Sequence, residues 1–256
     1  MNDTLVSLTN ISAVKGTKLV LKDLSWSTKK GEHWFILGNN GSGKSTLLEI
    51  VLGYHWPQSG EVSVLNQRFG QCLLADVRMK IGFVAPWVIK RNRSSLCVYN
   101  VIASGLDASI GIPDKVSNDG ERRIRKQSKF FACDAFLRTE FGVLSSGEQM
   151  RAILARAMVN EPEILILDEP FAHLDMHSRV QMYQLLARLA VVKSGPQILL
   201  VTHYLQDVVK MFTHGLVLKN GRVVLSGPKN FVLNSPVLAE KLDIPKSHMR
   251  MLEVIE

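Results

Sequence analysis

Residues 38–46 read Gly38-Asn39-Asn40-Gly41-Ser42-Gly43-Lys44-Ser45-Thr46 and satisfy every fixed position of the pattern G-x-x-x-x-G-K-[ST]. An apolar run of strand length, residues 33–37, comes before this stretch. Residues 47–52, which follow it, have the composition of a helix. The order strand, glycine loop, helix predicts an α/β fold built around this loop.

The loop has the residues needed to bind a nucleoside triphosphate together with Mg²⁺. Gly38, Gly41 and Gly43 let the backbone turn tightly and direct its N–H groups toward phosphate oxygens. Lys44 is expected to reach the β- and γ-phosphates, and the Ser45 hydroxyl to ligate Mg²⁺. The flanking strand and helix argue against the alternative, a Gly/Ser turn with an incidental lysine.

Composition restricts the class of protein. The chain has 256 residues, 46% of them hydrophobic, which is enough for one α/β domain with a subdomain. It has no apolar run of the length of a membrane span and no leader-like N-terminus, so we expect a cytosolic chain. Cys72, Cys97 and Cys133 are isolated and predict no disulfide framework or zinc site. The net charge of +8 favours contact with nucleic acid or an anionic membrane, without choosing between them.

The N-terminal part predicts a small antiparallel β subdomain. Residues 4–12 and 19–26 alternate apolar and polar side chains on either side of a turn, and residues 61–65 alternate again. A further strand is expected at residues 80–84. From about residue 87 to 143 the spacing becomes helical, which predicts a helical insert. The expected helical subdomain, residues 87–149, interrupts a nucleotide-binding core formed by residues 1–86 and 150–256.

The helical insert contains a basic run. Arg122, Arg123, Arg125, Lys126 and Lys129 lie within nine residues. A solvated helix face is the simpler interpretation and is favoured over a binding surface.

Two further stretches carry chemistry. Ser145, Gly147 and Glu148 form a polar turn ahead of an Ala- and Leu-rich helix at residues 150–158, which predicts a second phosphate-binding helix N-terminus. The apolar residues 164–167 predict a buried strand ending in Asp168-Glu169-Pro170. Asp168 is placed to hold the Mg²⁺ shell, and Glu169 to polarise an attacking water.

The last third predicts one more candidate site residue. Residues 172–175 precede an amphipathic helix at about 176–192. Residues 197–203 predict a strand with His203 at its end, a candidate sensor of the γ-phosphate. The other six histidines are assigned no role. Residues 216–225 predict a hairpin that turns at Asn220-Gly221.

Together these residues resemble the ATP-binding subunit of ABC transporters over nearly the whole chain. The matching motifs stand in the family's order: Walker A (Gly38–Ser45), signature (Leu144–Glu148), Walker B (Ile164–Asp168) with the catalytic carboxylate Glu169, D-loop (Ala172–Asp175) and switch histidine His203. The resemblance implies a P-loop NTPase of the ABC ATPase type, with an antiparallel β subdomain and a helical insert. It also implies a head-to-tail pair of ATPase chains, each ATP lying between the Walker A motif of one chain and the signature of the other. Hydrolysis would drive membrane-spanning subunits, with the chain peripheral on the inner face of the cell membrane.

Finer features resemble the ATPases of metal-chelate, iron and molybdate uptake, the molybdenum-transport group in particular. These features are Gly31–Trp34, Val98–Gly105, Ser109–Ile112 and the tail Gly227–Pro236.

Two positions depart from the family pattern. The aromatic residue that usually stacks on adenine is missing from Ser12–Gly16, where Val14 or Lys15 stands instead. The expected Q-loop glutamine is replaced in Ala85-Pro86-Trp87.

The first hypothesis is therefore an ATPase subunit that powers transport of a metal oxyanion or chelate. The alternative is a soluble ABC-type ATPase acting on nucleic acid or the ribosome. The chain has neither the tandem domains nor the long coiled coil typical of such members, which favours transport.

Overall fold

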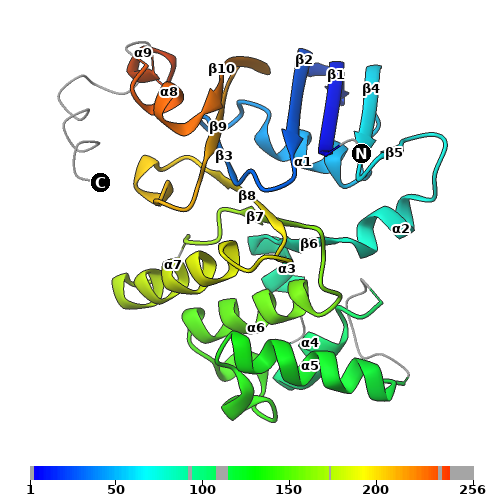
Figure 1. Cartoon of the computed structure of the whole chain (residues 1–256), viewed down its shortest axis with the longest axis vertical. Coiled ribbons are helices and arrows are strands. Elements are labelled where there is room, and N and C mark those ends of the chain that lie inside the picture. Colours follow the sequence, from blue (N-terminus) through cyan, green and yellow to red (C-terminus); the bar gives the residue numbers. More distant parts are fainter. Residues whose placement is uncertain (1–2, 92–93, 108–114, 173, 236–237, 243–256) are drawn as a thin grey trace. The chain divides into compact units, whose positions relative to one another are not determined.

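The computed structural model describes residues 3–91, 94–107, 115–172, 174–235 and 238–242 (Figure 1). The chain forms two compact units: unit 1 comprises Met1–Val77 and Gln197–Glu256, and unit 2 comprises Arg78–Pro196. Of the motifs given above, Ser109–Ile112, His173 of the D-loop and Pro236 at the end of the tail lie outside the described part.

Unit 1 contains a sheet in the order β2-β1-β4-β5, in which each strand pairs antiparallel with its neighbour (Figure 1). Alternating apolar residues turn one face of β1 and β2 inward, and Leu8, Leu21 and Leu24 are buried there. This confirms the expected β subdomain, although β1 and β2 are longer than the sequence pattern indicated. The strands are β1 (Thr4–Lys15), β2 (Lys18–Lys29), β4 (Ser59–Val64) and β5 (Gln67–Arg68).

Unit 1 also contains parallel strands. β3 (Trp34–Leu37) pairs in parallel with β8 (Gln197–Thr202) on one side and with β9 (His214–Lys219) on the other. All four β3 residues are buried. β9 and β10 (Arg222–Pro228) form the predicted hairpin. The turn residues Asn220 and Gly221 both have positive φ, 51° and 78°, as a two-residue type I′ hairpin turn requires. The helices of this unit include α1 (Lys44–Val51), α8 (Lys229–Leu233) and α9 (Leu238–Leu242), with a 3₁₀ turn η3 (Leu205–Asp207).

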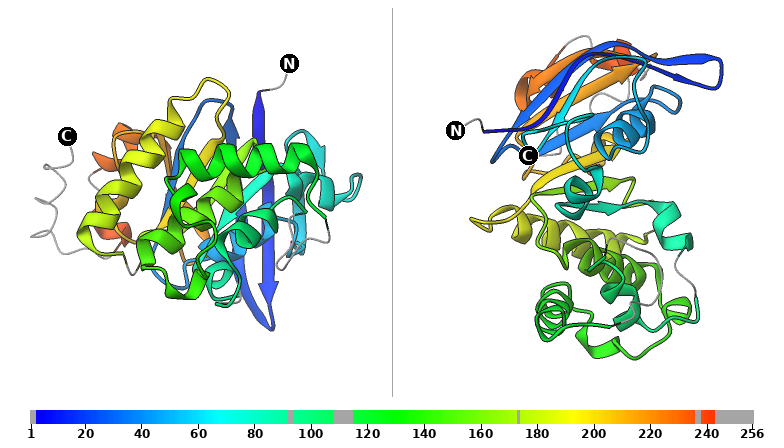
Figure 2. Two further views of the ribbon diagram at one scale, coloured as in Figure 1. Left: turned by 90° about the horizontal axis from the view of Figure 1, so that it is seen from below. Right: turned by 90° about the vertical axis from the view of Figure 1, so that its right-hand side faces the viewer.

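Unit 2 combines two parallel strands with a group of helices (Figure 2). Helix α6 packs against α4 and α5, and a Cβ on Gly105 would lie 2.3 Å from the Arg156 carbonyl, so glycine permits this close approach. The strands of unit 2 are β6 (Ile81–Val84) and β7 (Ile164–Asp168). Its helices are α3 (Pro86–Arg91), α4 (Val98–Ala103), α5 (Asn118–Phe130), α6 (Ser146–Met158) and α7 (Met176–Ala190). Two 3₁₀ turns, η1 (Asp134–Phe136) and η2 (Phe141–Val143), lie between α5 and α6, and α2 (Leu74–Met79) crosses the boundary between the units.

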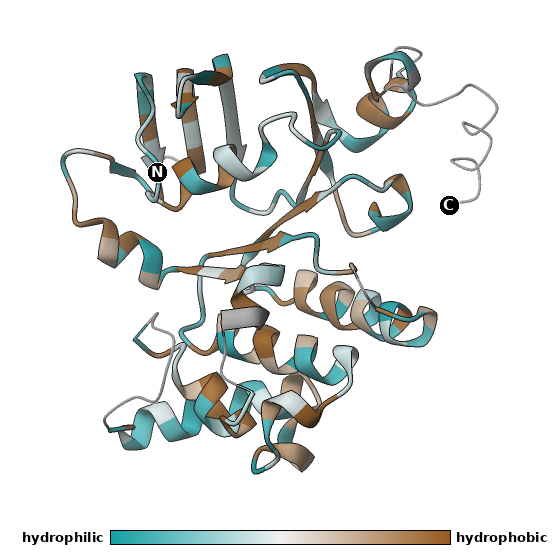
Figure 3. Ribbon diagram, turned by 180° about the vertical axis from the view of Figure 1, so that it is seen from behind, coloured by the Kyte–Doolittle hydropathy of each residue, from teal (hydrophilic) through white to brown (hydrophobic). Residues whose placement is uncertain are grey.

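The hydropathy of the ribbon matches this arrangement (Figure 3). Brown, hydrophobic colour runs along the central strands, whereas α5 is largely teal. Helix α6 begins at Ser146, four residues before the expected start, because Ser145 caps it. The division into a core (1–86, 150–256) and a helical subdomain (87–149) stays a prediction. Within the described residues, every helix is too short or too polar to serve as a membrane span.

Candidate functional site

The glycine loop between β3 and α1 has the geometry expected of a phosphate cradle. Gly43 is the N-cap of α1 with φ of 109°, and a Cβ there would lie 2.6 Å from a methyl carbon of Leu21. A Cβ on Gly38 would lie 2.5 Å from the Leu218 carbonyl oxygen. Gly41 also has a positive φ, 78°. A side chain would clash at Gly38 and Gly43 and would strain the backbone at Gly41, so glycine at these positions lets the backbone N–H groups face a ligand.

Lys44 is folded back over this loop. The Lys44 side chain is buried, and its ammonium donates to the carbonyl oxygens of Gly38 at 2.6 Å and Asn39 at 3.2 Å. These two carbonyl oxygens accept the hydrogen bonds that the Lys44 ammonium would otherwise donate to phosphate oxygens. A triphosphate bound here would give Lys44 a full charge partner in a partly dehydrated site.

The start of α1 fits an anion. Within the described residues, α1 has no acidic residue in its first turn and no side-chain cap at Gly43. Its positive dipole end is therefore not neutralised by a carboxylate of its own first turn. The buried Ser42 hydroxyl has no hydrogen-bond partner among the described residues. Ser45 is exposed, as a hydroxyl ligand of Mg²⁺ must be, and Thr46 is buried.

Two contacts that the sequence reasoning missed support the loop. The Gly221 N–H donates to the Ser42 carbonyl at 3.0 Å, and the Lys22 N–H donates to the Gly221 carbonyl at 2.9 Å. The Asn39 side-chain amide donates to the carbonyl of Leu242, at the end of α9, at 3.1 Å. The local pattern of Asn220-Gly221 predicts a turn but not its contact with Ser42, which lies 179 residues earlier in the chain.

His203 lies at the same sheet edge as the glycine loop. Leu37 and Thr202 are paired in the parallel register of β3 and β8, so Gly38 and His203 each follow a paired residue. The His203 ring packs against the Tyr204 ring, with 3.8 Å between centroids. Unit 1 therefore brings two of the predicted elements, the loop and the switch histidine, to adjacent strand ends.

Unit 2 positions the two acidic residues at the end of β7. Asp168 is the last strand residue, and Asp168 and Glu169 are both half-buried. Glu169 has φ of 50°, in the left-handed region that non-glycine residues seldom adopt. Its carbonyl accepts the Ala172 N–H at 3.2 Å, which closes a turn. Backbone strain of this kind is common at functional sites.

Ser145 and Glu148 form a capping box at the start of α6. The Ser145 hydroxyl donates to the Glu148 carboxylate at 2.7 Å, and the Ser145 N–H donates to the same oxygen at 2.9 Å. These hydrogen bonds, that of the hydroxyl first, lower the pKa of Glu148 below its ordinary value of 4.5. The Ser145 hydroxyl, predicted to face phosphate, thus already has a carboxylate acceptor in its own chain.

Gly147 in the signature turn contacts the start of α7. A Cβ on Gly147 would lie 2.5 Å from the Ser178 hydroxyl oxygen. Ser178 in turn donates its N–H to the Asp175 carboxylate at 2.7 Å, and Asp175 is the N-cap of α7. This backbone hydrogen bond is the first cause of the lowered pKa of Asp175. The signature turn and the end of the D-loop at Asp175 therefore lie close together within unit 2.

The structure shows what surrounds the two positions that depart from the family pattern. The Lys15 ammonium forms an ion pair with Glu49 of α1, with distances of 2.9 and 3.0 Å to the two carboxylate oxygens. Pro86 is the first residue of α3. Proline suits this position because the N–H group that it lacks would have no partner within the helix.

The comparisons with known proteins agree with this geometry. The family model described as "ABC transporter" matches residues 21–172. The chain is 32% identical over 242 residues to "Uncharacterized ABC transporter ATP-binding protein YlmA" of Bacillus subtilis, covering 94% of this chain and 92% of that protein. It is 32% identical to "Zinc uptake system ATP-binding protein ZurA" of Listeria monocytogenes, covering 87% and 85%. It is 35% identical to "ABC transporter ATP-binding protein ModF" of Escherichia coli, covering 84% of this chain and 44% of that protein.

Solved structures show the same fold. A cassette from Clostridium perfringens, "cbiO1", described as part of the ABC transporter complex cbiONQ, aligns with a TM-score of 0.81 at 26% identity, covering 99% of this chain and 100% of that one. "Dimeric Structure of MJ0796, a Bacterial ABC Transporter Cassette" aligns with a TM-score of 0.74 at 28% identity, covering 88% and 98%. The predicted fold class is confirmed. This chain belongs to the ABC transporter family, as an ATP-binding cassette that hydrolyses ATP.

Proposed function

We propose that this cassette is the ATPase subunit of a transporter whose membrane-spanning subunits are separate chains, and that two copies work head to tail. One observation carries the proposal: a single chain has two glycine-containing turns that each lead into a helix N-terminus, at Gly43 for α1 and at Ser145 for α6. Two copies would place both N-termini on one triphosphate. The dimeric cassette among the similar structures supports this arrangement.

In the proposed site, both chains contribute residues that contact the same ATP. One copy binds the phosphates through residues 38–46, and its Ser45 and Asp168 hold Mg²⁺, which neutralises charge on the β- and γ-phosphates when bound. Glu169 polarises the attacking water and His203 contacts the γ-phosphate. The other copy closes the site with Ser145, Gly147 and Glu148.

The transported substrate that we propose is a metal ion, chelate or metal oxyanion. The support is the similarity to a protein named for zinc uptake and to one named ModF. The sequence features that resemble the molybdenum group are consistent with this class but do not distinguish its members.

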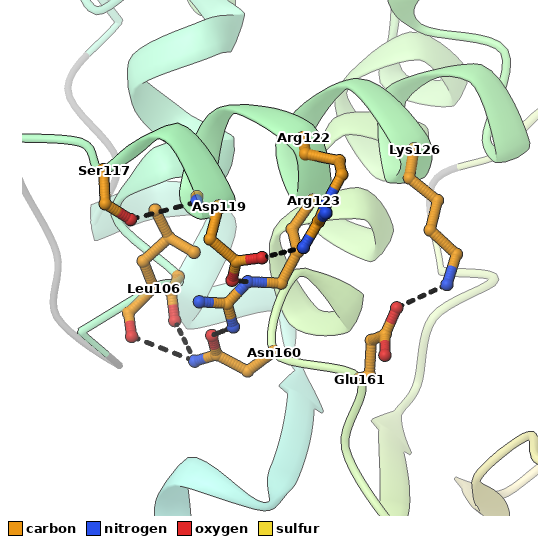
Figure 4. Close-up of polar contacts among 10 residues, drawn as sticks. Leu106, Ser117, Asp119, Arg122, Arg123, Lys126, Asn160 and Glu161 are labelled. Atoms are coloured by element: carbon orange, nitrogen blue, oxygen red, sulfur yellow. Dashed lines mark hydrogen bonds and ion pairs between the residues drawn. The ribbon is translucent and has the colours of Figure 1, made fainter.

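The proposed position of the chain is cytoplasmic, peripheral on the anionic inner face of the membrane. The basic run of helix α5 would attract such a surface, but several of its side chains form ion pairs within the chain (Figure 4). Arg122 and Arg123 both form ion pairs with Asp119, and Lys126 forms one with Glu161. These pairs reduce the attraction that α5 exerts at a distance, because each carboxylate offsets part of the basic charge.

Arg125 and Lys129 are exposed on the same helix, four residues apart. Each basic residue near an anionic surface contributes about 1 kcal/mol to association, so two of them favour weak binding only. Firm attachment would then depend on the membrane-spanning subunits.

The dimer is tested by the ATPase rate per chain over a dilution series. We expect this rate to fall as the chains dissociate, because each site needs two chains. A rate per chain that stays constant through the dissociation range would contradict the composite site.

The membrane assignment is tested by purifying the tagged chain in mild detergent and identifying the proteins that accompany it. Membrane-spanning subunits are expected. In parallel, binding to anionic vesicles, duplex DNA and RNA is compared for the wild type and for Arg125→Gln/Lys129→Gln, with Lys18→Gln/Lys30→Gln as a charge-matched control. Tight nucleic-acid binding lost only in the α5 variant, together with ATPase stimulation by that nucleic acid, would favour the soluble alternative.

A further inference from the structure

A buried hydrogen-bond pair flanks His203. The Thr202 hydroxyl donates to a carboxylate oxygen of Asp207 at 2.6 Å. The same hydroxyl accepts the backbone N–H of Tyr204 at 3.0 Å. One oxygen atom therefore connects the residue before His203 with the residue after it and fixes both to Asp207.

Asp207 is well placed to hold this turn rigid. Thr202 is 1% exposed and Asp207 2% exposed, so neither side chain can reach a ligand in solvent. A carboxylate is buried at a large cost unless hydrogen bonds compensate, and a hydroxyl bonded to a charged acceptor is among the stronger hydrogen bonds. The N–H of Asp207 also donates to the Tyr204 carbonyl at 3.2 Å, within the short η3 segment.

The turn is also tied to the phosphate-binding strand. Thr202 pairs in register with Leu37, the residue before Gly38. Any displacement of Thr202 would therefore change where His203 stands relative to the glycine loop. The mechanism assigned above uses neither Thr202 nor Asp207, although Asp207 is a buried ionisable group at the edge of the site.

We propose that Thr202 and Asp207 are positioning residues that hold His203 at the γ-phosphate. The inference rests on the proposed role of His203. A histidine that contacts phosphate must lie within hydrogen-bond reach of it, and a displacement of about 1 Å costs roughly a hundredfold in rate. The buried Thr202–Asp207 pair confines His203 by fixing both of its neighbours.

The test compares two substitutions of Thr202. Thr202→Val keeps the shape and removes the hydroxyl, whereas Thr202→Ser keeps the hydroxyl. We expect Thr202→Val to lower kcat about ten- to a hundredfold with KM and ATP affinity unchanged, and Thr202→Ser to stay near the wild type. Asp207→Asn, which keeps an acceptor oxygen but loses the charge, provides a second variant should Thr202→Val fold poorly. It should lower kcat in the same direction.

Thr28→Val is the matched control. Thr28 is also completely buried in unit 1, and its hydroxyl donates to Gln197 at the opposite end of β8, at 2.8 Å. This variant likewise loses a buried threonine hydroxyl and its hydrogen bond, here to a neutral amide oxygen, and should lose thermal stability. Its kcat, measured below the unfolding transition of all variants, should not change. Equal kcat losses in Thr28→Val and Thr202→Val would show a general effect of stability and overturn the proposal.

A double-mutant cycle separates the proposal from its premise. In a His203→Ala background, Thr202→Val should cause no further loss of kcat, because the residue that it positions is gone. An equal loss in both backgrounds would overturn the positioning role. A His203→Ala variant with undiminished kcat would instead remove the premise. The ring resonances of His203, assigned by comparison with His203→Gln, should shift or broaden in Thr202→Val and Asp207→Asn but not in Thr28→Val.

Discussion

The backbone N–H of Gly221 donates to the carbonyl of Ser42, 3.0 Å away, so the β9–β10 turn supports the phosphate-binding loop. Gly221 has φ of 78°, and a Cβ there would lie 2.0 Å from the Val20 carbonyl oxygen. The turn must therefore carry glycine to come this close to both β2 and the loop.

Gly221→Ala should weaken ATP binding and lower the free energy of unfolding by about 1–3 kcal/mol, because the new methyl group would clash with the Val20 carbonyl and displace the turn whose N–H group supports Ser42. Denaturant unfolding and nucleotide titration measure the two effects. Gly70→Ala is the control: Gly70 has φ of 90° with nothing within 4 Å of the added methyl, so it should lose stability but keep ATP affinity. Unchanged ATP affinity in Gly221→Ala would show that the loop does not need this support.

Glu169→Gln should keep ATP binding and lose roughly 10²–10⁴-fold in turnover, the usual contribution of a general base. The nucleotide would then persist and hold two chains together. Lys44→Ala should instead weaken binding itself, since it removes the buried ammonium. Gel filtration of both variants with ATP and Mg²⁺ tests the assignment. A monomeric Glu169→Gln that hydrolyses ATP at the original rate would contradict it.

Ser145→Ala should destabilise α6 by about 0.5–2 kcal/mol, because it removes the N-cap hydroxyl. It should also change how the free energy of unfolding depends on pH in the acid range. The lowered pKa of Glu148 means that its ionised form stabilises the folded state above pH 4.5, and that this contribution is lost as the pH falls through the folded-state pKa below that value. Unfolding free energies of the wild type and Ser145→Ala from pH 3 to 7 should therefore converge at the acid end; a constant difference would argue against the capping box.

Gly147→Ala should lower both stability and ATPase activity, because the methyl group would meet Ser178 at 2.5 Å. Ser178→Gly creates space for it. The double variant Gly147→Ala/Ser178→Gly should thus recover stability relative to Gly147→Ala alone, beyond the sum of the single effects. Recovery of stability without ATPase activity would mean that Gly147 also contacts the nucleotide. Additive stability losses would show that the Gly147–Ser178 contact is unimportant.

GTP should compete appreciably with ATP, because aliphatic Val14 and ion-paired Lys15 stand where an aromatic residue would stack on the base. Stacking on an aromatic residue contributes about 1–3 kcal/mol per base. Val14→Tyr should therefore tighten ATP binding if this residue faces adenine, and Lys15→Tyr tests the neighbouring position. Competition titrations with ATP and GTP measure the change. Unchanged dissociation constants in both variants would assign base contact to another residue.

Much of the cassette followed from local sequence alone. The glycine loop, the buried strands ending at Asp168 and Thr202, and the Asn220-Gly221 hairpin were all predicted, because each depends on the conformational preferences and spacing of residues that are near neighbours. The order of the motifs was sufficient to indicate the family. The start of α6 was predicted late, since capping by Ser145 extends the helix through a polar turn that has no apolar periodicity.

Tertiary structure decided which of these elements support one another. The hydrogen bond from Gly221 to Ser42, the approach of Gly147 to Ser178 and the pairing of Leu37 with Thr202 all join residues distant in sequence. The ion pair of Lys126 with Glu161 also joins residues distant in sequence, and its carboxylate offsets part of the charge of the basic run in α5. No local pattern encodes such contacts, because they arise only when strand register and helix packing bring separate segments within a few ångströms.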